Sequence, residues 1–311
     1  RNLVQNIDVV PNPALTKIDL SVGDPTIYGN LQPPAIVQQK LSELVLAGTS
    51  NGYPQSMGTI EARKAVAQFF SNRPGTGPNN KSPKLDFQDV FLTPGGSGAL
   101  ELALSVIADP GENVLIPQPG FPLFRTQAGT LGIECKRYKI VPERDWEIDL
   151  ESVRAAVDEH TRAIILNNPS NPCGSVWKRQ HVADILKLAA ELKLVVIADE
   201  IYADMVFSGN EFCSTADQAQ HFQVPVLTLG GISKRFVVPG WRLGWVLMYD
   251  QMGILEKAGV RKGMNQLTTR MLIPSRLIQS ILPTMLDETT RDSHDSFVKL
   301  MEELELNAQV C

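Results

Sequence analysis

The sequence has no excess of charge of one sign and no long apolar run. Its 29 lysines and arginines stand against 34 aspartates and glutamates, which gives a net charge of −5. This balance provides no positive surface for nucleic acid or an anionic membrane, and no apolar run is long enough to cross a bilayer. With 43% hydrophobic and 20% charged residues, the composition is typical of a soluble globular protein. We expect neither nucleic acid nor a membrane as a partner.

Cysteine and histidine are scarce and scattered. The four cysteines are Cys135, Cys173, Cys213 and Cys311, and the four histidines are His160, His181, His221 and His294. Neither set has the spacing of a zinc site, and the cysteines form no dense disulfide framework. The pattern predicts no metal and a reducing compartment, for which we take the cytoplasm. The chain opens at Arg1 without a methionine, so a mitochondrial location with a removed targeting peptide stays open.

Short β-rich runs alternate with helical stretches from about residue 89 onward. The runs cover residues 89–93, 113–117, 134–140, 162–167, 193–198, 224–229 and 241–248. Residues 181–192 place apolar side chains three and four positions apart, which predicts a helix with one buried face. The alternation predicts an α/β fold, in which helices cover a mostly parallel seven-stranded sheet.

The N-terminal 45 residues differ from this pattern. Five prolines, at positions 11, 13, 25, 33 and 34, predict a loop-rich arm without long regular elements, packed outside the main sheet. Residues 73–84 have the composition of a surface loop. Near the C-terminus, residues 296–306 have the amphipathic pattern of a helix.

Several strand ends carry residue types that suit a ligand. After the first strand, Thr93-Pro-Gly-Gly-Ser-Gly98 precedes the apolar periodic residues 99–108, so free N–H groups at a helix start would face an anion such as phosphate. Such a glycine turn also occurs without a ligand, and Gly-x-Gly-x-x-Gly is absent. The two Asn-Pro steps of residues 168–172 predict a rigid turn that holds the Asn171 amide toward a ligand. Cys173 is interpreted as a packing residue.

Asp199 ends the buried run 195–198, at the sheet edge where α/β proteins place ligands. Its carboxylate would suit a protonated pyridine nitrogen, and Tyr202 would reach the phenolic oxygen of the same ring. The alternative is that Asp199 caps the next helix.

Lys234 and Arg242 lie eight positions apart in Ser-Lys-Arg-Phe-Val-Val-Pro-Gly-Trp-Arg. A lysine that condenses with an aldehyde needs a lowered pKa and a fixed position, and an arginine binds phosphate, so the pair suggests pyridoxal 5'-phosphate (PLP). A solvated loop lysine is the alternative. The order of Asn171, Asp199, Tyr202, Lys234 and Arg242 at successive strand ends favours the cofactor.

With these motifs the chain resembles the fold type I PLP-dependent aminotransferases, and most closely their tyrosine aminotransferase branch. The resemblance runs from residue 18 to about residue 279, and residues 168–176 and 238–245 are its most specific parts. It implies that Lys234 forms the internal aldimine and moves the substrate proton, and that Asp199 pairs with the pyridine nitrogen. It further implies that Asn171 and Tyr202 hold the ring hydroxyl and that Phe121 stacks on the ring.

The resemblance also implies that Arg242, Ser97 and the backbone at Gly96 and Gly98 hold the phosphate. Tyr53 matches a tyrosine that reaches the phosphate of a neighbouring subunit, which implies a homodimer. The implied substrate-binding residues are Gly23, which matches a glycine of the N-terminal arm, and Asn171.

Two departures from the family pattern concern binding groups. Gly231 replaces a serine that contacts phosphate in many relatives. The family's C-terminal domain supplies an arginine for the substrate carboxylate, and Arg270, Arg276 and Arg291 do not match its motif. The resemblance therefore implies an N-terminal arm over residues 1–45, a large PLP-binding domain over residues 46–286, and an interdomain helix over residues 287–311. The small domain is expected to be only partly present.

The sequence thus predicts transfer of the amino group of tyrosine or another aromatic amino acid to a 2-oxo acid, by a ping-pong cycle between PLP and pyridoxamine phosphate. Two alternatives stay open. One is a different PLP enzyme of the same fold, such as an alanine-type aminotransferase or a carbon-sulfur lyase. The other is a non-catalytic binding protein that kept the fold, although such a protein would have no physical need for Lys234, Asp199 and Arg242 together.

Overall fold

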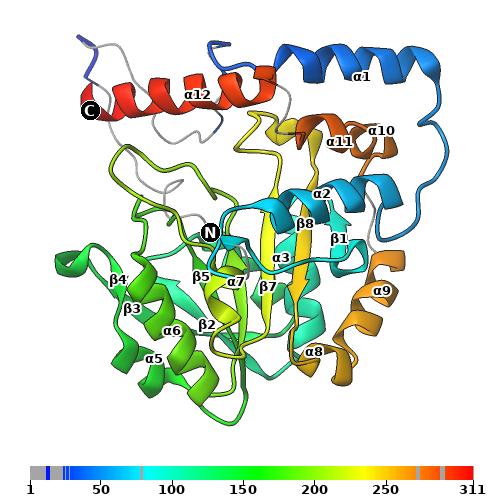
Figure 1. Cartoon of the computed structure of the whole chain (residues 1–311). Coiled ribbons are helices and arrows are strands. Elements are labelled where there is room, and N and C mark those ends of the chain that lie inside the picture. Colours follow the sequence, from blue (N-terminus) through cyan, green and yellow to red (C-terminus); the bar gives the residue numbers. More distant parts are fainter. Residues whose placement is uncertain are drawn as a thin grey trace.

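The computed structural model describes residues 12–14, 24, 26–27, 29–77, 80–270, 274–287 and 291–310. Its centre is a sheet with strand order β1-β8-β7-β6-β5-β2-β3-β4 (Figure 1). The strands are β1 (Val90–Thr93), β2 (Asn113–Gln118), β3 (Glu134–Val141), β4 (Glu147–Ile148), β5 (Thr161–Asn167), β6 (Val195–Asp199), β7 (Val226–Gly231) and β8 (Gly244–Tyr249). All seven predicted strands form, and the two-residue β4 is an eighth that the sequence pattern did not predict.

The sheet is mixed rather than fully parallel. Strands β3, β2, β5, β6 and β7 pair in parallel in that order. Strand β8 lies antiparallel between β7 and β1, so β1 runs in the same direction as β7. The carboxyl ends of β1, β2, β5, β6 and β7 therefore meet at one edge of the sheet, and the first residues of β8 lie at the same edge.

Helices cover both faces of the sheet. They are α1 (Ala35–Ala47), α2 (Ile60–Asn72), α3 (Gly95–Ile107), α4 (Pro122–Thr130), α5 (Leu150–Ala156), α6 (Arg179–Glu191), α7 (Thr215–Ala219), α8 (Ile254–Lys257), α9 (Val260–Arg270), α10 (Arg276–Gln279), α11 (Leu282–Met285) and α12 (Arg291–Val310). None of the helices in the described part of the chain is long and apolar enough to span a membrane. Helix α6 matches the predicted helix, and α12 includes the predicted one.

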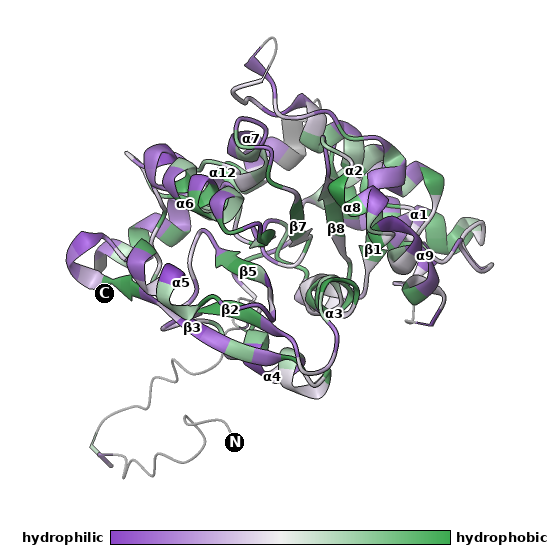
Figure 2. Cartoon of the chain, turned by 90° about the horizontal axis from the view of Figure 1, so that it is seen from below, coloured by the Kyte–Doolittle hydropathy of each residue, from purple (hydrophilic) through white to green (hydrophobic). Residues whose placement is uncertain are grey.

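Two hydrophobic cores lie on opposite faces, because successive side chains of a strand point in opposite directions. In β5, Ile164 and Leu166 join the core under α2, α6, α7 and α11. Ala163 and Ile165 of the same strand join the core under α3, α4 and α9. Figure 2 shows apolar residues on inner strands such as β2 and β5, whereas hydrophilic residues lie along β3 and the outer helices. The result is a three-layer α/β/α arrangement, and the predicted fold class is confirmed.

The prediction of an N-terminal arm without long regular elements is wrong for residues 35–47. Helix α1 forms there directly after Pro33 and Pro34, and Pro34 occupies the N-cap position. A proline before the first turn costs no helical hydrogen bond, because the first N–H groups of a helix have no partner within it. Val37 of α1 is fully buried in the core. The predicted domain limits at residues 45 and 286 stay predictions.

Candidate active site

Residues from six segments meet at the carboxyl edge of the sheet. They are Gly96, Ser97 and Gly98 after β1, Phe121 after β2, Asn171 after β5, Asp199 and Tyr202 at the end of β6, Lys234 after β7, and Arg242 before β8. Because ligands of α/β proteins bind outside the carboxyl ends of the strands, this edge is the candidate site.

An anion cradle forms where Arg242 approaches the start of α3. A Cβ atom on Gly95 would lie 2.8 Å from Nη2 of Arg242, so the guanidinium touches the glycine turn. Nη1 of Arg242 donates to the carbonyl of Pro239 at 3.0 Å, and the residue remains exposed. The helix begins at Gly95, four residues earlier than predicted, so the backbone of Gly96 and Ser97 belongs to its first turn. The positive helix end and the guanidinium together favour a phosphate.

Gly244 allows the backbone to close this cradle. It pairs with Gly231 of β7 on one side and with Thr93 of β1 on the other. A Cβ atom on Gly244 would lie 2.5 Å from the carbonyl carbon of Gly95 and 2.8 Å from the carbonyl oxygen of Gly230. No real side chain tolerates such contacts with backbone, so the approach of β8 to the glycine turn requires glycine at this position.

Asp199 ends β6 between Asn167 and Leu229 of the neighbouring strands. Burial raises the pKa of its carboxyl to about 6, against the smaller effect of a backbone hydrogen bond from the Ile201 N–H, which is 3.2 Å long. The alternative that Asp199 caps the next helix is wrong, because turns follow β6 and the next described helix begins at Thr215. Partial removal from water makes the charged form of this carboxyl less stable, and a cationic ligand beside it would restore that stability.

The turn that carries Asn171 is tied to the same strand ends. The Asn171 N–H donates to Oδ1 of Asn167 at 2.7 Å, and the Asn168 N–H donates to the carbonyl of Asp199 at 3.2 Å. Asn171 and Tyr202 both line an open cavity of about 670 Å3, as does Cys173. Burial raises the pKa of the Cys173 thiol, which agrees with its interpretation as a packing residue.

Lys234 lies next to Tyr202, with its Nζ 5.6 Å from the centroid of the tyrosine ring. Burial lowers the pKa of Lys234; the charge of Asp24 opposes this shift, and the charge of Arg242 adds to it. Burial also raises the pKa of Tyr202, and the nearby Asp199 charge adds to that effect. The amine therefore has a larger neutral fraction than an exposed lysine, whereas the phenol keeps its proton.

The other predicted residues lie apart from this contact. Phe121 is half-buried at the start of α4 and packs edge-on against Phe124, with 5.8 Å between ring centroids. Tyr53, in the loop between α1 and α2, is 99% exposed, so it contributes nothing to the site of its own chain. Gly23 lies outside the described residues. The three therefore keep the roles that the resemblance implied only as predictions.

Four charged residues beside the site were missed by the sequence analysis. Glu200 is buried, accepts the Thr215 N–H at 2.7 Å, and has a pKa raised to about 7 by burial. Asp204 pairs with Arg235, the neighbour of Lys234, and with Arg73 of the loop after α2. Glu200, Asp204 and Arg235 stand one or two positions from Asp199, Tyr202 and Lys234, and this closeness in sequence was a usable signal. The pairing itself was not, because Arg73 is 131 positions from Asp204.

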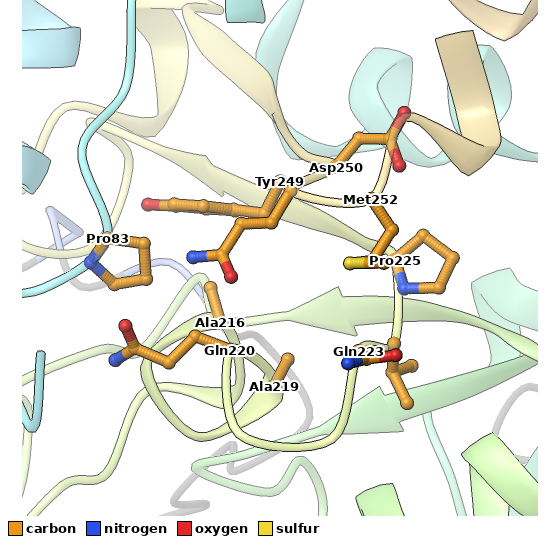
Figure 3. Close-up of a pocket in the computed structure, with 11 residues that line it drawn as sticks. Pro83, Ala216, Ala219, Gln220, Gln223, Pro225, Tyr249, Asp250 and Met252 are labelled. Atoms are coloured by element: carbon orange, nitrogen blue, oxygen red, sulfur yellow. The ribbon is translucent and has the colours of Figure 1, made fainter. Parts of the chain in front are cut away.

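A further pocket lies at the opposite edge of the sheet, near the amino end of β7 (Figure 3). Tyr249, Met252 and Gln220 are among its lining residues. Its volume of about 10 Å3 is too small for more than one water molecule. The described residues also contain no group of three or more His, Cys, Asp or Glu side chains that could hold a metal ion.

Comparison with known proteins shows the family to which the chain belongs. The chain is 42% identical over its full length to tyrosine aminotransferase of Bos taurus and 40% identical to that of Mus musculus. It spans 66% and 65% of those proteins, slightly less than two thirds of their length. The crystal structure of tyrosine aminotransferase from Leishmania infantum is 35% identical, with a TM-score of 0.86 over 94% of this chain and 76% of that one. The family Aminotransferase class I and II matches residues 16–310. The predicted resemblance is thereby confirmed, and the chain belongs to the class I and II aminotransferases.

Proposed function

We propose that the protein is a PLP-dependent aminotransferase that moves the amino group of tyrosine or another aromatic amino acid to a 2-oxo acid. The observation that carries this proposal is the contact of Lys234 with Tyr202, at the sheet edge that also carries Asp199 and the Arg242 cradle. A lysine with a lowered pKa, a carboxylate with a raised pKa and a helix start lined by an arginine are the three charge features that suit PLP.

The residues fit the cofactor group by group. Arg242 and the N–H groups at the start of α3, with the Ser97 hydroxyl, would hold the phosphate. Asp199 would hold the pyridine nitrogen in its protonated form, because a cation there stabilises the half-buried carboxylate. Asn171 and Tyr202 would hold the ring hydroxyl. Phe121 would lie against the ring face, as the family resemblance implies.

When bound, PLP supplies an aldehyde that condenses with amines and a ring that withdraws electrons from the substrate α-carbon. The protein contributes the rest. Lys234 would hold the aldehyde through Nζ and, when free, would move a proton at the substrate α-carbon. Because its pKa is lowered, the amine loses its own proton more easily than an exposed lysine and so serves as a nucleophile and a base.

The cavity beside Asn171 and Tyr202 supports an aromatic substrate. Trp146, Met205 and Phe207 contribute to its lining, and these side chains offer apolar and aromatic surface to a ring. The names of the most similar relatives support the same substrate class. Gly23 of the N-terminal arm would line the same substrate site.

A second copy of the chain would complete the site. Tyr53 is 99% exposed, and a large aromatic side chain left in solvent is a common feature of an interface that the single chain does not show. We infer a homodimer in which Tyr53 reaches the phosphate held by the neighbouring subunit.

The test is an absorbance spectrum of the full-length protein with PLP, before and after L-tyrosine is added without an acceptor. We expect a visible band that L-tyrosine removes and a 2-oxo acid restores. Lys234→Ala should abolish the band, whereas Lys187→Ala, a change of an exposed lysine on α6, should preserve it. A band that survives Lys234→Ala would overturn the proposal. A response to L-alanine alone, or release of a thiol from a sulfur-containing amino acid, would reassign the substrate.

A further inference from the structure

Tyr202 and Lys234 lie on two separate segments of irregular backbone. Tyr202 belongs to the turns between β6 and α7, and Lys234 to the segment between β7 and β8. Neither segment is part of the sheet ladder, yet Nζ of Lys234 is only 5.6 Å from the Tyr202 ring centroid. Without further contacts, such segments would move independently on the ends of their strands. A contact between the two segments is therefore required to fix the distance.

Asp204 makes this contact through both oxygens of its carboxylate. Oδ2 accepts a hydrogen bond from Nη1 of Arg235 at 2.9 Å, and Oδ1 accepts one from Nη2 of Arg73. The Met205 N–H donates to the carbonyl of Tyr202 at 3.0 Å, so the carboxylate and Tyr202 belong to one tight turn. Asp204 itself has a φ of +66°, in the left-handed region that few residues other than glycine, asparagine and aspartate adopt.

Aromatic faces hold the two guanidinium groups in place. Cζ of Arg235 lies 4.2 Å from the ring centroid of Phe297 in α12 and 5.5 Å from that of Phe69. Cζ of Arg73 lies 5.5 Å from the ring centroid of Phe70. The planar guanidinium stacks on aromatic rings and keeps its charge, so these contacts limit the motion of the hydrogen-bond donors.

Partial burial makes the ion pair stronger than a typical surface pair. The side chains of Arg73, Arg235 and Asp204 are 15%, 20% and 29% exposed, and water screens such groups less than fully exposed ones. Removing the carboxylate would break the link between Arg73 and Arg235, the second of which is adjacent in sequence to Lys234. The geometry beside the lysine therefore depends on Asp204.

We propose that Asp204 is a positioning residue that ties the Tyr202 turn to the Lys234 segment through Arg235 and so fixes the contact between the two functional side chains. This inference rests on the proposed function for its catalytic meaning, because only then does the distance between lysine and tyrosine affect turnover. Helix α12 is part of the same arrangement, since Phe297 covers Arg235 and Glu305 accepts the Ser208 N–H at 3.1 Å. Figure 1 shows α12 lying beyond the strand ends, over these segments.

The test compares two ion pairs of similar exposure. Asp204→Asn keeps the shape of the side chain and removes its charge. The matched control is Asp89→Asn, because Asp89 pairs with Arg261 at 2.7 Å, with side chains 20% and 24% exposed, just before β1 and so at the opposite edge of the sheet. Both variants lose a partly buried ion pair, but only Asp204→Asn changes the environment of Lys234.

The first readout needs no cofactor. Acetic anhydride labels neutral amines, and mass spectrometry gives the rate at Lys234 relative to the exposed Lys187 in the same sample. A change of half a pKa unit alters the neutral amine fraction about threefold, so we expect Asp204→Asn to change the relative rate about threefold or more. Asp89→Asn should leave it unchanged. An equal rate in Asp204→Asn and the wild type would overturn the inference.

The second readout uses the PLP-loaded, full-length protein. A displacement of about 1 Å between reacting groups lowers turnover by about 100-fold, so we expect kcat to fall about 10- to 100-fold in Asp204→Asn with little change in KM. The visible circular dichroism of the bound cofactor should change as well. Equal losses in Asp89→Asn would overturn the inference. If Asp204→Asn does not fold, Arg235→Lys, which keeps the charge and loses the fork of donors, takes its place in both experiments. A wild type without a PLP band would refute the proposed function and leave the labelling result valid.

Discussion

Replacing Asp199 with asparagine should stabilise the cofactor-free protein and weaken its cofactor binding at the same time. The carboxyl group of Asp199 lies at the end of β6, where burial disfavours its charged form. Among the effects on its pKa, only the backbone hydrogen bond from Ile201 favours that form. Asparagine has the same shape and keeps an oxygen that can accept the Ile201 N–H. It has no charge to desolvate, and it cannot stabilise a protonated pyridine nitrogen.

The size of the effect follows from the pKa. A rise from 3.8 to about 6 corresponds to at most about 3 kcal/mol of stability, at 1.36 kcal/mol for each pKa unit. Because the folded pKa is the higher one, this stability is fully present below pH 3.8 and is lost as the pH rises through about 6. About 1.4 kcal/mol of the loss falls between pH 5 and pH 8. Because asparagine does not titrate, the stability of Asp199→Asn does not fall with pH for this reason.

The assay is urea unfolding of the cofactor-free wild type and of Asp199→Asn at pH 5 and pH 8. We expect the free energy of unfolding of the variant, relative to the wild type, to rise by about 1.4 kcal/mol between the two pH values. The buried Glu200, with its pKa near 7, titrates in the same range, but it is present in both proteins and cancels. PLP titration at pH 8 should show weaker binding by the variant. A relative stability that does not change with pH would refute the reasoning.

Three further results are expected from changes around the phosphate cradle. Gly244→Ala should destabilise the protein by about 1–3 kcal/mol, because the new Cβ meets backbone at 2.5 Å in a packed region; Gly240→Ala, which meets nothing within 4 Å, is the control in urea unfolding, and equal losses would contradict the prediction. Arg242→Met should weaken PLP binding about 10-fold or more, because a charge-assisted hydrogen bond contributes about 1.5–3 kcal/mol; unchanged affinity in a fluorescence titration would contradict this role. Inactive Tyr53→Ala and Lys234→Ala proteins, mixed and refolded together, should regain activity through heterodimers with one intact site, and absence of rescue would count against a shared site.

The sequence by itself determined where the strands end and which residues follow them. Short runs rich in β-forming residues, bounded by proline, glycine or asparagine, define strands locally, so Asn171, Asp199 and Lys234 were placed at strand ends without a structure. The parallel alternation then predicted that those ends meet at one edge. The spacing of Lys234 and Arg242 suggested the cofactor because its aldehyde and phosphate need these two side chains.

Only the tertiary structure decided which segments touch. Strand β8 enters the sheet between β7 and β1, and this order brings Arg242 against Gly95 and makes Gly244 the point of closest backbone approach. Helix α1 forms after two prolines because its buried Val37 packs against the core, a contact that no local pattern encodes. The link between Asp204, Arg235 and Arg73 joins residues as far as 131 positions apart. A local pattern records how each segment buries its own apolar face, whereas strand order and ion pairing depend on where the other segments pack.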